Sequence, residues 1–241
     1  MNKLILCEGI TDAILLSYYL GKTAGWVFCQ KGPKEFAIKT QSQNESVNWY
    51  KRGNDYLLIC GVGGKDNFGS FFETRIKRPL VDANAFEKIA IVTDRDERQI
   101  DEIEKGLSDS LGSFFQGLRN RTWLTNQYKD SFGRQKDVGV LLVVIPKEHF
   151  GALENVMLAA ISEDPYDKRI VDKSAEFVRQ MRYDAEKYIG TDRLQLKAHL
   201  GVTWAIQYPE KVFSLLHEQI CSVKWERSEV LEVCFGLLRE I

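Results

Sequence analysis

The sequence has no hydrophobic run that approaches the roughly 20 apolar residues needed to span a bilayer. The apolar stretch near the N-terminus is too short for a signal-peptide core and is not followed by a small-residue cleavage site, so we expect a cytoplasmic protein without a membrane partner. The five cysteines are scattered, and none forms a CxxC pair. A structural zinc site or a disulfide framework is therefore not expected.

The sequence also lacks an excess of charge of one sign. Lys and Arg total 33 and Asp and Glu total 34, which gives a net charge of −1. This balance argues against a protein that coats nucleic acid along its whole surface, but it leaves room for a local basic groove. No segment has the GxxxxGK[ST] spacing of a P-loop, so ATP binding by that route is not expected.

Short apolar runs are the strongest structural signal in the chain. Each is continuous rather than alternating, as is typical of parallel strands that are covered on both faces. The four clearest runs and a weaker fifth are Leu4–Cys7, Tyr56–Cys60, Ile89–Thr93, Val138–Ile145 and Trp26–Cys29.

Helical patterns lie between these runs, at Thr11–Leu20, Phe68–Ile76 and Glu97–Leu118. Two polar stretches, residues 34–54 and 119–137, are predicted as excursions from the sheet. Strands that alternate with helices predict an α/β fold: a Rossmann-like, mostly parallel sheet flanked by helices, with right-handed crossovers.

The strand signals stop near residue 165, and helical patterns follow at Asp167–Tyr188, Arg193–Ile206 and Glu210–Ile241. We therefore predict an α/β domain over residues 1–164. A helical C-terminal part over residues 165–241 is expected to pack on it or beside it.

Carboxylates follow two of the predicted strands directly. Glu8 ends the first strand, and Asp94 and Asp96 end the strand near residue 93. Ligands of open α/β sheets bind beyond the carboxyl ends of the strands, so we expect these three side chains to share one crevice. Such a cluster repels itself unless a cation or proton is present, and its hard oxygen ligands suit Mg²⁺ or Mn²⁺.

The alternative is that these residues are ordinary strand-end and capping carboxylates, because a lone DxD is a short motif. Glu8 argues against this alternative, since capping does not need a glutamate between a buried strand and Gly9. For Asp12 the expected role is to cap or support the helix that follows.

These segments resemble a known family. Glu8-Gly9-Ile10-Thr11-Asp12 resembles the EGxxD element of Toprim domains, and Asp94-Arg95-Asp96 resembles their DxD element, with matching order over roughly residues 3–100. Toprim domains occur in topoisomerases, bacterial primases and several nucleases. Gln99 stands where many primase-like members have glycine, which disfavours a primase or topoisomerase.

Two further segments are similar to nucleases of the overcoming-lysogenization-defect (OLD) type. The run that contains Gly63, Gly64 and Lys65 resembles their GGKxNF-like turn, whose amides and lysine would cradle a phosphate; the alternative is a tight turn with a solvated lysine. Leu153-Glu154 resembles their LE element, so Glu154 is expected to serve a second metal or merely the helix dipole.

The run from Lys197 to Pro209 also resembles the tail of a small, uncharacterised bacterial family of Toprim-related proteins. This similarity supports the fold and says little about the substrate. His199 and Trp204 within the run are interpreted as packing residues of a helix.

The resemblance implies a metal-dependent nuclease. Asp94 and Asp96 would bind the metal, Glu8 would be a further ligand or the general acid/base, and Lys65 and Arg95 would steady the scissile phosphate. A basic groove is expected between these residues and the second polar stretch, which carries Arg119, Arg121, Arg134 and Lys136.

Other interpretations stay open. The chain is short for an OLD-type nuclease, whose ATPase lies on the same chain, so a non-catalytic binding or regulatory module in a repair or defence assembly is the main alternative. A phosphatase or receiver domain would use the DxD but leave Glu8 without a role. The sequence does not distinguish DNA from RNA, or a homodimer from a complex with a partner protein.

Overall fold

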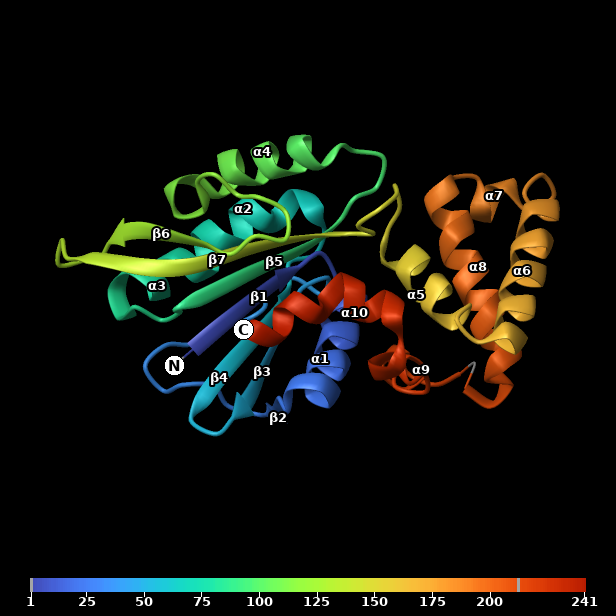
Figure 1. Ribbon diagram of the computed structural model, residues 1–241, viewed down its shortest axis with the longest axis horizontal. Helices are drawn as coiled ribbons and strands as arrows, with labels where there is room; N and C mark the ends of the chain where they lie inside the picture. The colour runs from blue at the N-terminus through green and yellow to red at the C-terminus, as the bar shows by residue number, and fades with distance from the viewer. Residues whose placement is uncertain (1, 212) are drawn as a thin grey trace.

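A single seven-stranded sheet forms the centre of the molecule in the computed structural model, which describes residues 2–211 and 213–241. The strand order is β2-β3-β4-β1-β5-β7-β6 (Figure 1). The strands are β1 Asn2–Cys7, β2 Val27–Cys29, β3 Ser46–Arg52, β4 Asp55–Gly61, β5 Lys88–Asp94, β6 Leu124–Lys129 and β7 Gln135–Ile145.

The four central strands, β4, β1, β5 and β7, are parallel, and all four were predicted from their continuous apolar runs. The predicted α/β class with a mostly parallel sheet is confirmed. Antiparallel strands extend both sides of this centre: β3 and β2 beyond β4, and β6 beyond β7.

Two of these outer strands correct the prediction, because β3 and β6 lie inside the stretches that were expected to be excursions from the sheet. Only Trp49 and Tyr50 of β3 are buried, and only Tyr128 of β6 is. Edge strands with mixed polar side chains lack the apolar run that identifies a central strand. They form because the neighbouring strand, here β4 or β7, offers hydrogen-bond partners to their backbone.

Helices cover both faces of the sheet, because alternate strand residues point to opposite sides. One face carries α2, the π-helical turn after it, α3 and α4, which pack on Leu4, Leu6 and their neighbours. The other face carries α1 and the C-terminal helices, which pack on Ile5, Cys7 and their neighbours. The bounds are α1 Ile10–Ala24, α2 Phe68–Phe71, π turn Phe72–Ile76, α3 Lys77–Ala83 and α4 Ile100–Leu111.

Three helix boundaries differ from the prediction. Helix α1 continues past Gly21 and ends before Gly25, whose left-handed φ of 72° closes it. The pattern near residues 97–118 forms α4 and then a separate 3₁₀ turn at Gly112–Phe115. The last predicted helix is broken into short α-helical and 3₁₀ segments.

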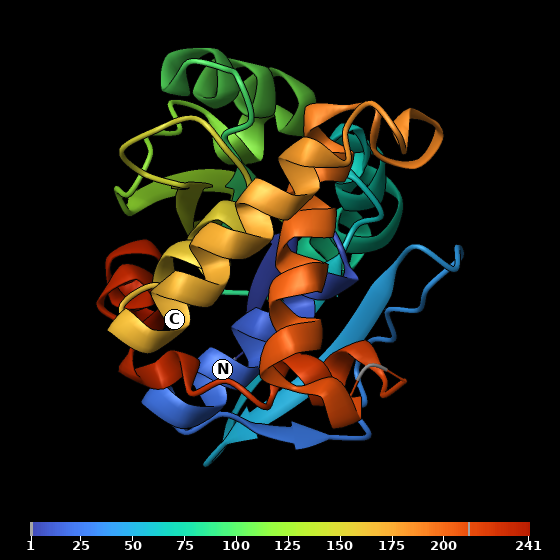
Figure 2. The same cartoon turned by 90° about the vertical axis from the view of Figure 1, so that its right-hand side faces the viewer.

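The C-terminal helices are α5 Leu153–Ile161, α6 Pro165–Gln180, α7 Glu186–Ile189, α8 Asp192–Gln207, α9 Leu216–Ile220 and α10 Glu229–Phe235. Helices α6 and α8 lie side by side beyond the carboxyl edge of the sheet, as Figure 2 shows, and α5 joins them to it. The chain then returns to the sheet: Phe235 is fully buried, with its ring 5.9 Å from that of Tyr19 in α1. Residues after 216 thus share the hydrophobic core of the α/β part.

None of the helices in the described residues is both long and apolar enough to cross a membrane. The five cysteines are all free thiols. Nε2 of His199 donates to the carbonyl of Val171 at 2.9 Å and Trp204 is buried, which agrees with the packing role expected for both residues.

Candidate functional site at the carboxyl edge of the sheet

The first two predicted carboxylates stand on neighbouring strands. Strand β1 pairs with β5 so that Cys7 lies opposite Val92, and both strands end within two residues of that pair. Glu8 and Asp94 therefore emerge at the same edge of the sheet, where each retains only 5–6% of its accessible surface.

Glu8 is held in place by β5. Its Oε1 accepts a hydrogen bond from the Thr93 hydroxyl at 2.6 Å and another from the Asp94 amide at 2.8 Å. Two donors fix this carboxylate before any ligand arrives, and hydrogen bonds to an ionised acceptor are among the stronger ones. Thr93 was not singled out from the sequence, since a threonine at the end of a β-strand is ordinary.

Asp94 is directed toward α5. Its Oδ1 accepts a hydrogen bond from the amide of Leu153, the first residue of that helix, at 2.9 Å. Burial raises the pKa of Asp94 well above its usual range, and the nearby carboxylates of Asp12, Glu8, Glu154 and, least, Asp96 raise it further. The predicted acidic neighbourhood thus includes five side chains from separate parts of the chain.

Asp12 is a more central member of this neighbourhood than a helix cap needs to be. Its Oδ2 accepts a hydrogen bond from the Gly9 amide at 3.1 Å, which agrees with the supporting role predicted for both residues. Its Oδ1, however, is buried without a hydrogen-bond partner. Burial, followed by repulsion from Glu8, raises the pKa of Asp12 to about 7.

Asp96 turns away from Asp94. The sequence argument placed both side chains on one side of an extended segment, but Asp96 has a left-handed φ of 50°. Its backbone forms a pair of hydrogen bonds with Gly151, at 2.7 and 2.9 Å, and its Oδ2 lies 2.5 Å from Nζ of Lys65. The DxD motif therefore supplies one buried carboxylate and one that forms an ion pair with Lys65.

The glycine-rich turn brings Lys65 to this position. Gly63 and Gly64 have φ values of 82° and 124°, which L side chains rarely adopt. The amide of Gly64 donates to the carbonyl of Glu8 at 2.8 Å. This amide is thus used within the protein and is not available to a phosphate, while the Lys65 ammonium pairs with Asp96.

Glu154 and Arg95 have protein partners of their own. Glu154, in the first turn of α5, lies 3.3 Å from the ammonium of Lys197 in α8. Arg95 was predicted to bind phosphate, but its guanidinium lies 4.6 Å from the ring centroid of Phe150 and donates to the carbonyls of Arg98 and Lys147. These contacts join two loops at the edge of the sheet.

The carboxylates do not form a closed set of metal ligands. Within the described residues, no three His, Cys, Asp or Glu side chains are placed to hold an ion together. Several oxygens nevertheless accept no hydrogen bond from any described residue: Oε2 of Glu8, Oδ2 of Asp94, Oδ1 of Asp12 and Oδ1 of Asp96. Mg²⁺ is commonly bound by one or two carboxylates, water and substrate phosphates, so this donor set fits such an ion.

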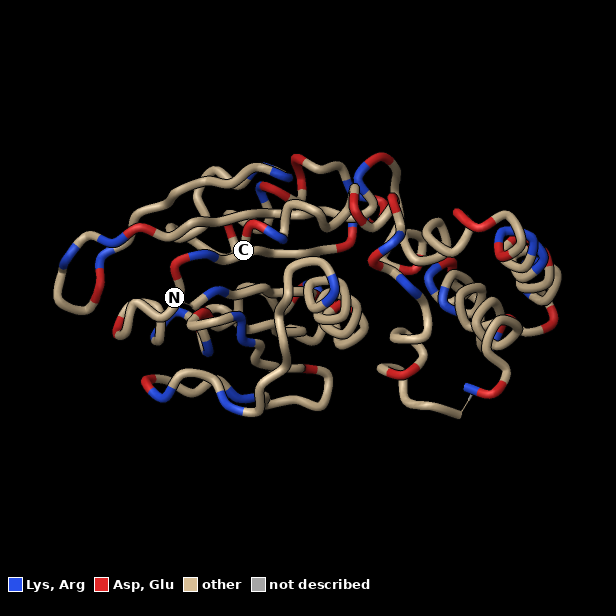
Figure 3. The backbone as a smooth tube through the Cα atoms, turned by 60° about the horizontal axis from the view of Figure 1, so that its bottom comes forward, with Lys and Arg blue, Asp and Glu red and all other residues tan. Residues whose placement is uncertain are grey.

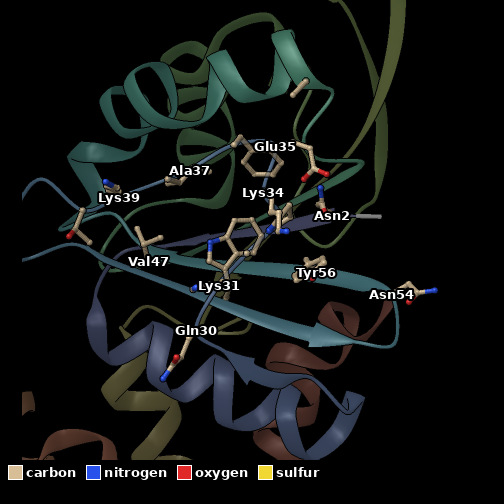
Figure 4. A pocket seen from close by; sticks show the side chains of 17 residues that line it. Asn2, Gln30, Lys31, Lys34, Glu35, Ala37, Lys39, Val47, Asn54 and Tyr56 are labelled. Carbon is tan, nitrogen blue, oxygen red and sulfur yellow. The ribbon is translucent and has the colours of Figure 1, made fainter.

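Two of the cavities near the sheet differ in whether they adjoin the acidic neighbourhood. One, of about 640 Å³, is bounded by the ion pair of Lys65 and Asp96, by the loop around Phe150 and by the start of α8. The other, of about 1320 Å³, lies along β3 beneath residues 30–40, with Trp49 and Tyr56 among its lining residues (Figure 4). No carboxylate of the acidic neighbourhood lines the second cavity.

The predicted basic groove is wrong. Arg134 and Lys136 lie at the turn of the β6–β7 hairpin, and Lys136 precedes Ile145 by nine residues of β7, or about 30 Å at 3.3 Å per residue. Since Ile145 is the neighbour of Asp94, these basic residues stand at the opposite edge of the sheet. Figure 3 shows Lys and Arg segments on the far end of the extended hairpin. Arg119 instead pairs with Glu104 at 2.9 Å.

Arg121 is engaged elsewhere, because its guanidinium donates to the carbonyls of Val233 and Cys234 in α10. It fastens the returning C-terminal helices to the loop before β6. Arg134 and Lys136 therefore lie away from the carboxylates. Arg119 and Arg121 flank Asn120, whose side chain accepts a hydrogen bond from the Val144 amide near the carboxyl end of β7, but their own side chains are engaged by Glu104 and by α10.

Comparison with known proteins gives a family and no activity. No curated protein matches the chain significantly. A crystal structure of a hypothetical protein from Pyrococcus horikoshii OT3 is similar to it, with a TM-score of 0.49 and 16% identity over 98% of this chain and 99% of that chain. A family model described as "Protein of unknown function (DUF3226)" matches residues 2–225, and the chain belongs to this family.

Proposed function

We propose that the chain is a divalent-metal-dependent phosphodiesterase that acts on nucleic acid, a nuclease of the Toprim type that uses Mg²⁺ or Mn²⁺. The observation that carries the proposal is the buried cluster of Glu8, Asp12 and Asp94 at the carboxyl edge of the parallel sheet, with Lys65 beside it. That edge is where open α/β sheets bind their ligands. Mutually repelling buried carboxylates favour a bound cation or a retained proton.

Different residues would bind the metal, orient its ligands and contact the phosphate. A divalent ion held by Glu8 and Asp94 would neutralise charge that builds on the phosphate oxygens and would activate the attacking water. Thr93 and the Asp94 amide keep Glu8 oriented, and the Leu153 amide does the same for Asp94. Lys65, whose side chain is 35% exposed, reaches a phosphate oxygen by rotating away from Asp96.

A non-catalytic binding or regulatory module is the second candidate. The ion pair between Lys65 and Asp96 favours it, because both groups are neutralised in this arrangement and no preformed three-residue metal site lies in the described chain. Metal-dependent turnover distinguishes the two functions, since binding alone releases no cleaved product.

The test is a cleavage assay on single-stranded and duplex DNA and RNA, with Mg²⁺ or Mn²⁺, at low and moderate salt. We expect metal-dependent cleavage, lowered by about a hundredfold or more in Glu8→Gln. Asp109→Asn, at an exposed position of α4, is the matched control and should retain the wild-type rate. Absence of cleavage on every substrate, by protein that still binds the metal, would refute the nuclease proposal in favour of the binding module.

A further inference from the structure

The cavity beside the ion pair of Lys65 and Asp96 contains two arginines that the resemblance to Toprim domains does not include. Arg98 follows the DxD segment in the loop before α4, and Arg193 lies in the first turn of α8. They come from the α/β part and from the C-terminal helices, and both line the same space of about 640 Å³. The cavity therefore joins the two parts of the chain at the acidic site.

Neither arginine has an anionic partner among the described residues. Six charged residues line the cavity: Lys65, Arg98, Arg193, Asp96, Glu97 and Asp192. Lys65 pairs with Asp96, and Asp192 lies 3.6 Å from Arg182, which is not a lining residue. Within the described residues, the side chains of Arg98 and Arg193 form no ion pair and no hydrogen bond.

Arg98 is the more informative of the two. Its Nε is buried without a hydrogen-bond partner, although a buried donor that is left unpaired costs about 1–3 kcal/mol. A guanidinium binds phosphate or carboxylate through parallel hydrogen bonds, and two of them across one cavity suit an anion with several oxygens. The acidic site next to it makes a phosphate group of the substrate the fitting anion.

Phe150 adds an aromatic surface to the same cavity. Its side chain lines the space and is 46% exposed, while the Arg95 guanidinium lies over the ring. Nucleobases stack on such rings with little regard to their sequence. A phosphate site and an aromatic surface within one cavity match the parts of a nucleotide.

We propose that this cavity is a nucleotide subsite, in which Arg98 and Arg193 bind the phosphate next to the scissile one and Phe150 stacks on the adjoining base. The inference rests on the proposed function and specifies its substrate contacts. It replaces the basic groove at the opposite edge of the sheet with two arginines that adjoin Asp96. The ligand class is a phosphorylated dinucleotide unit of a single strand.

The test measures binding of two probes by calorimetry with the metal chelated: inorganic pyrophosphate and a 5′-phosphorylated dinucleotide. We expect Arg98→Gln and Arg193→Gln each to weaken both probes by about tenfold or more, the usual effect of losing a charge-assisted hydrogen bond. Phe150→Leu should weaken the dinucleotide and leave pyrophosphate unchanged. The control is Arg179→Gln, at an exposed position of α6 that does not line the cavity. Thermal melts verify that each variant is folded.

Unchanged affinity for both probes in the two arginine variants, or no binding by the wild type, would overturn the subsite. The outcome is separable from that of the nuclease assay. Binding that depends on Arg98 and Arg193 in a protein that never cleaves supports the subsite and refutes the nuclease. Metal-dependent cleavage that is unchanged in both arginine variants supports the nuclease and refutes the subsite.

Discussion

The acidic neighbourhood should make the metal-free protein less stable as the pH rises. Burial and Glu8 raise the pKa of Asp12 from 3.8 to about 7, and the pKa of Asp94 is raised as well. A carboxyl with a native pKa above its unfolded value stabilises the native state fully below the unfolded pKa. This contribution is lost as the pH rises through the native pKa, so the window runs from about pH 4 to pH 7.

The magnitude follows from the shift of Asp12. Three pKa units correspond to about 4 kcal/mol, of which about 2–3 kcal/mol falls between pH 5 and pH 7. Asp55 does not interfere, because its hydrogen bond with Lys3 lowers its pKa to about 2, below this window. A change of this size is a large fraction of the free energy of unfolding of a typical domain, so it should be measurable.

Urea unfolding with a chelator, between about pH 5 and pH 8, measures the effect. We expect the free energy of unfolding to fall with rising pH in the wild type, and the slope to be less steep in Asp12→Asn, in which, of these two carboxyls, only Asp94 retains a raised pKa. The asparagine retains a side-chain oxygen that accepts a hydrogen bond from the Gly9 amide, so the start of helix α1 keeps this hydrogen bond. Asp109→Asn should behave as the wild type does. A wild type that is equally or more stable at pH 8, or an Asp12→Asn variant with the wild-type slope, would refute the reasoning.

Three further predictions concern the same edge of the sheet. Asp94→Asn should raise the melting temperature of the metal-free protein and remove its stabilisation by Mn²⁺, because it deletes one repelling carboxylate and one ligand; a thermal-shift titration checks both effects. Gly61→Ala should destabilise the protein by about 1–3 kcal/mol in urea unfolding and reduce its response to Mn²⁺, because the new Cβ would lie 2.7 Å from the carbonyl oxygen of Gly9. The control is Gly106→Ala, whose Cβ meets no atom within 4 Å, and this variant should be neutral or stabilising. Lys65→Gln should weaken binding of single-stranded nucleic acid at low salt, whereas Arg134→Gln should not; equal losses would restore the groove that the fold contradicts.

The four central strands were predictable because burial on both faces forces continuous apolar runs such as Leu4–Cys7. The position of Glu8 beside Asp94 was predictable for a related reason, since parallel neighbours end at one edge of the sheet. The direction of Asp96 was not. It depends on a left-handed residue and on a backbone pair with Gly151, which lies more than fifty residues away in the sequence.

The misplaced basic groove has a physical cause that the sequence itself contains. Residues that follow a parallel strand emerge at its carboxyl edge, whereas residues that immediately precede one, as Arg134 and Lys136 precede most of β7, lie at the amino edge. The prediction of a groove holds only if residues close in the chain to β7 are also close to Asp94, which stands beside the last residue of that strand. The direction of β7 excludes this proximity, because nearly the whole length of the strand separates Arg134 and Lys136 from Asp94.

The same rule explains why Arg98 is placed well for a substrate although no motif identified it. It follows β5, so it must emerge at the carboxyl edge, as do the loops after β1, β4 and β7. Arg193 reaches this edge only because α8 packs across α5, a contact between segments far apart in sequence. A chain with a net charge of −1 can thus present unpaired cations to a phosphate, because the pairing of the charges that line one cavity, and not the total charge, decides which cations are left to bind an anion.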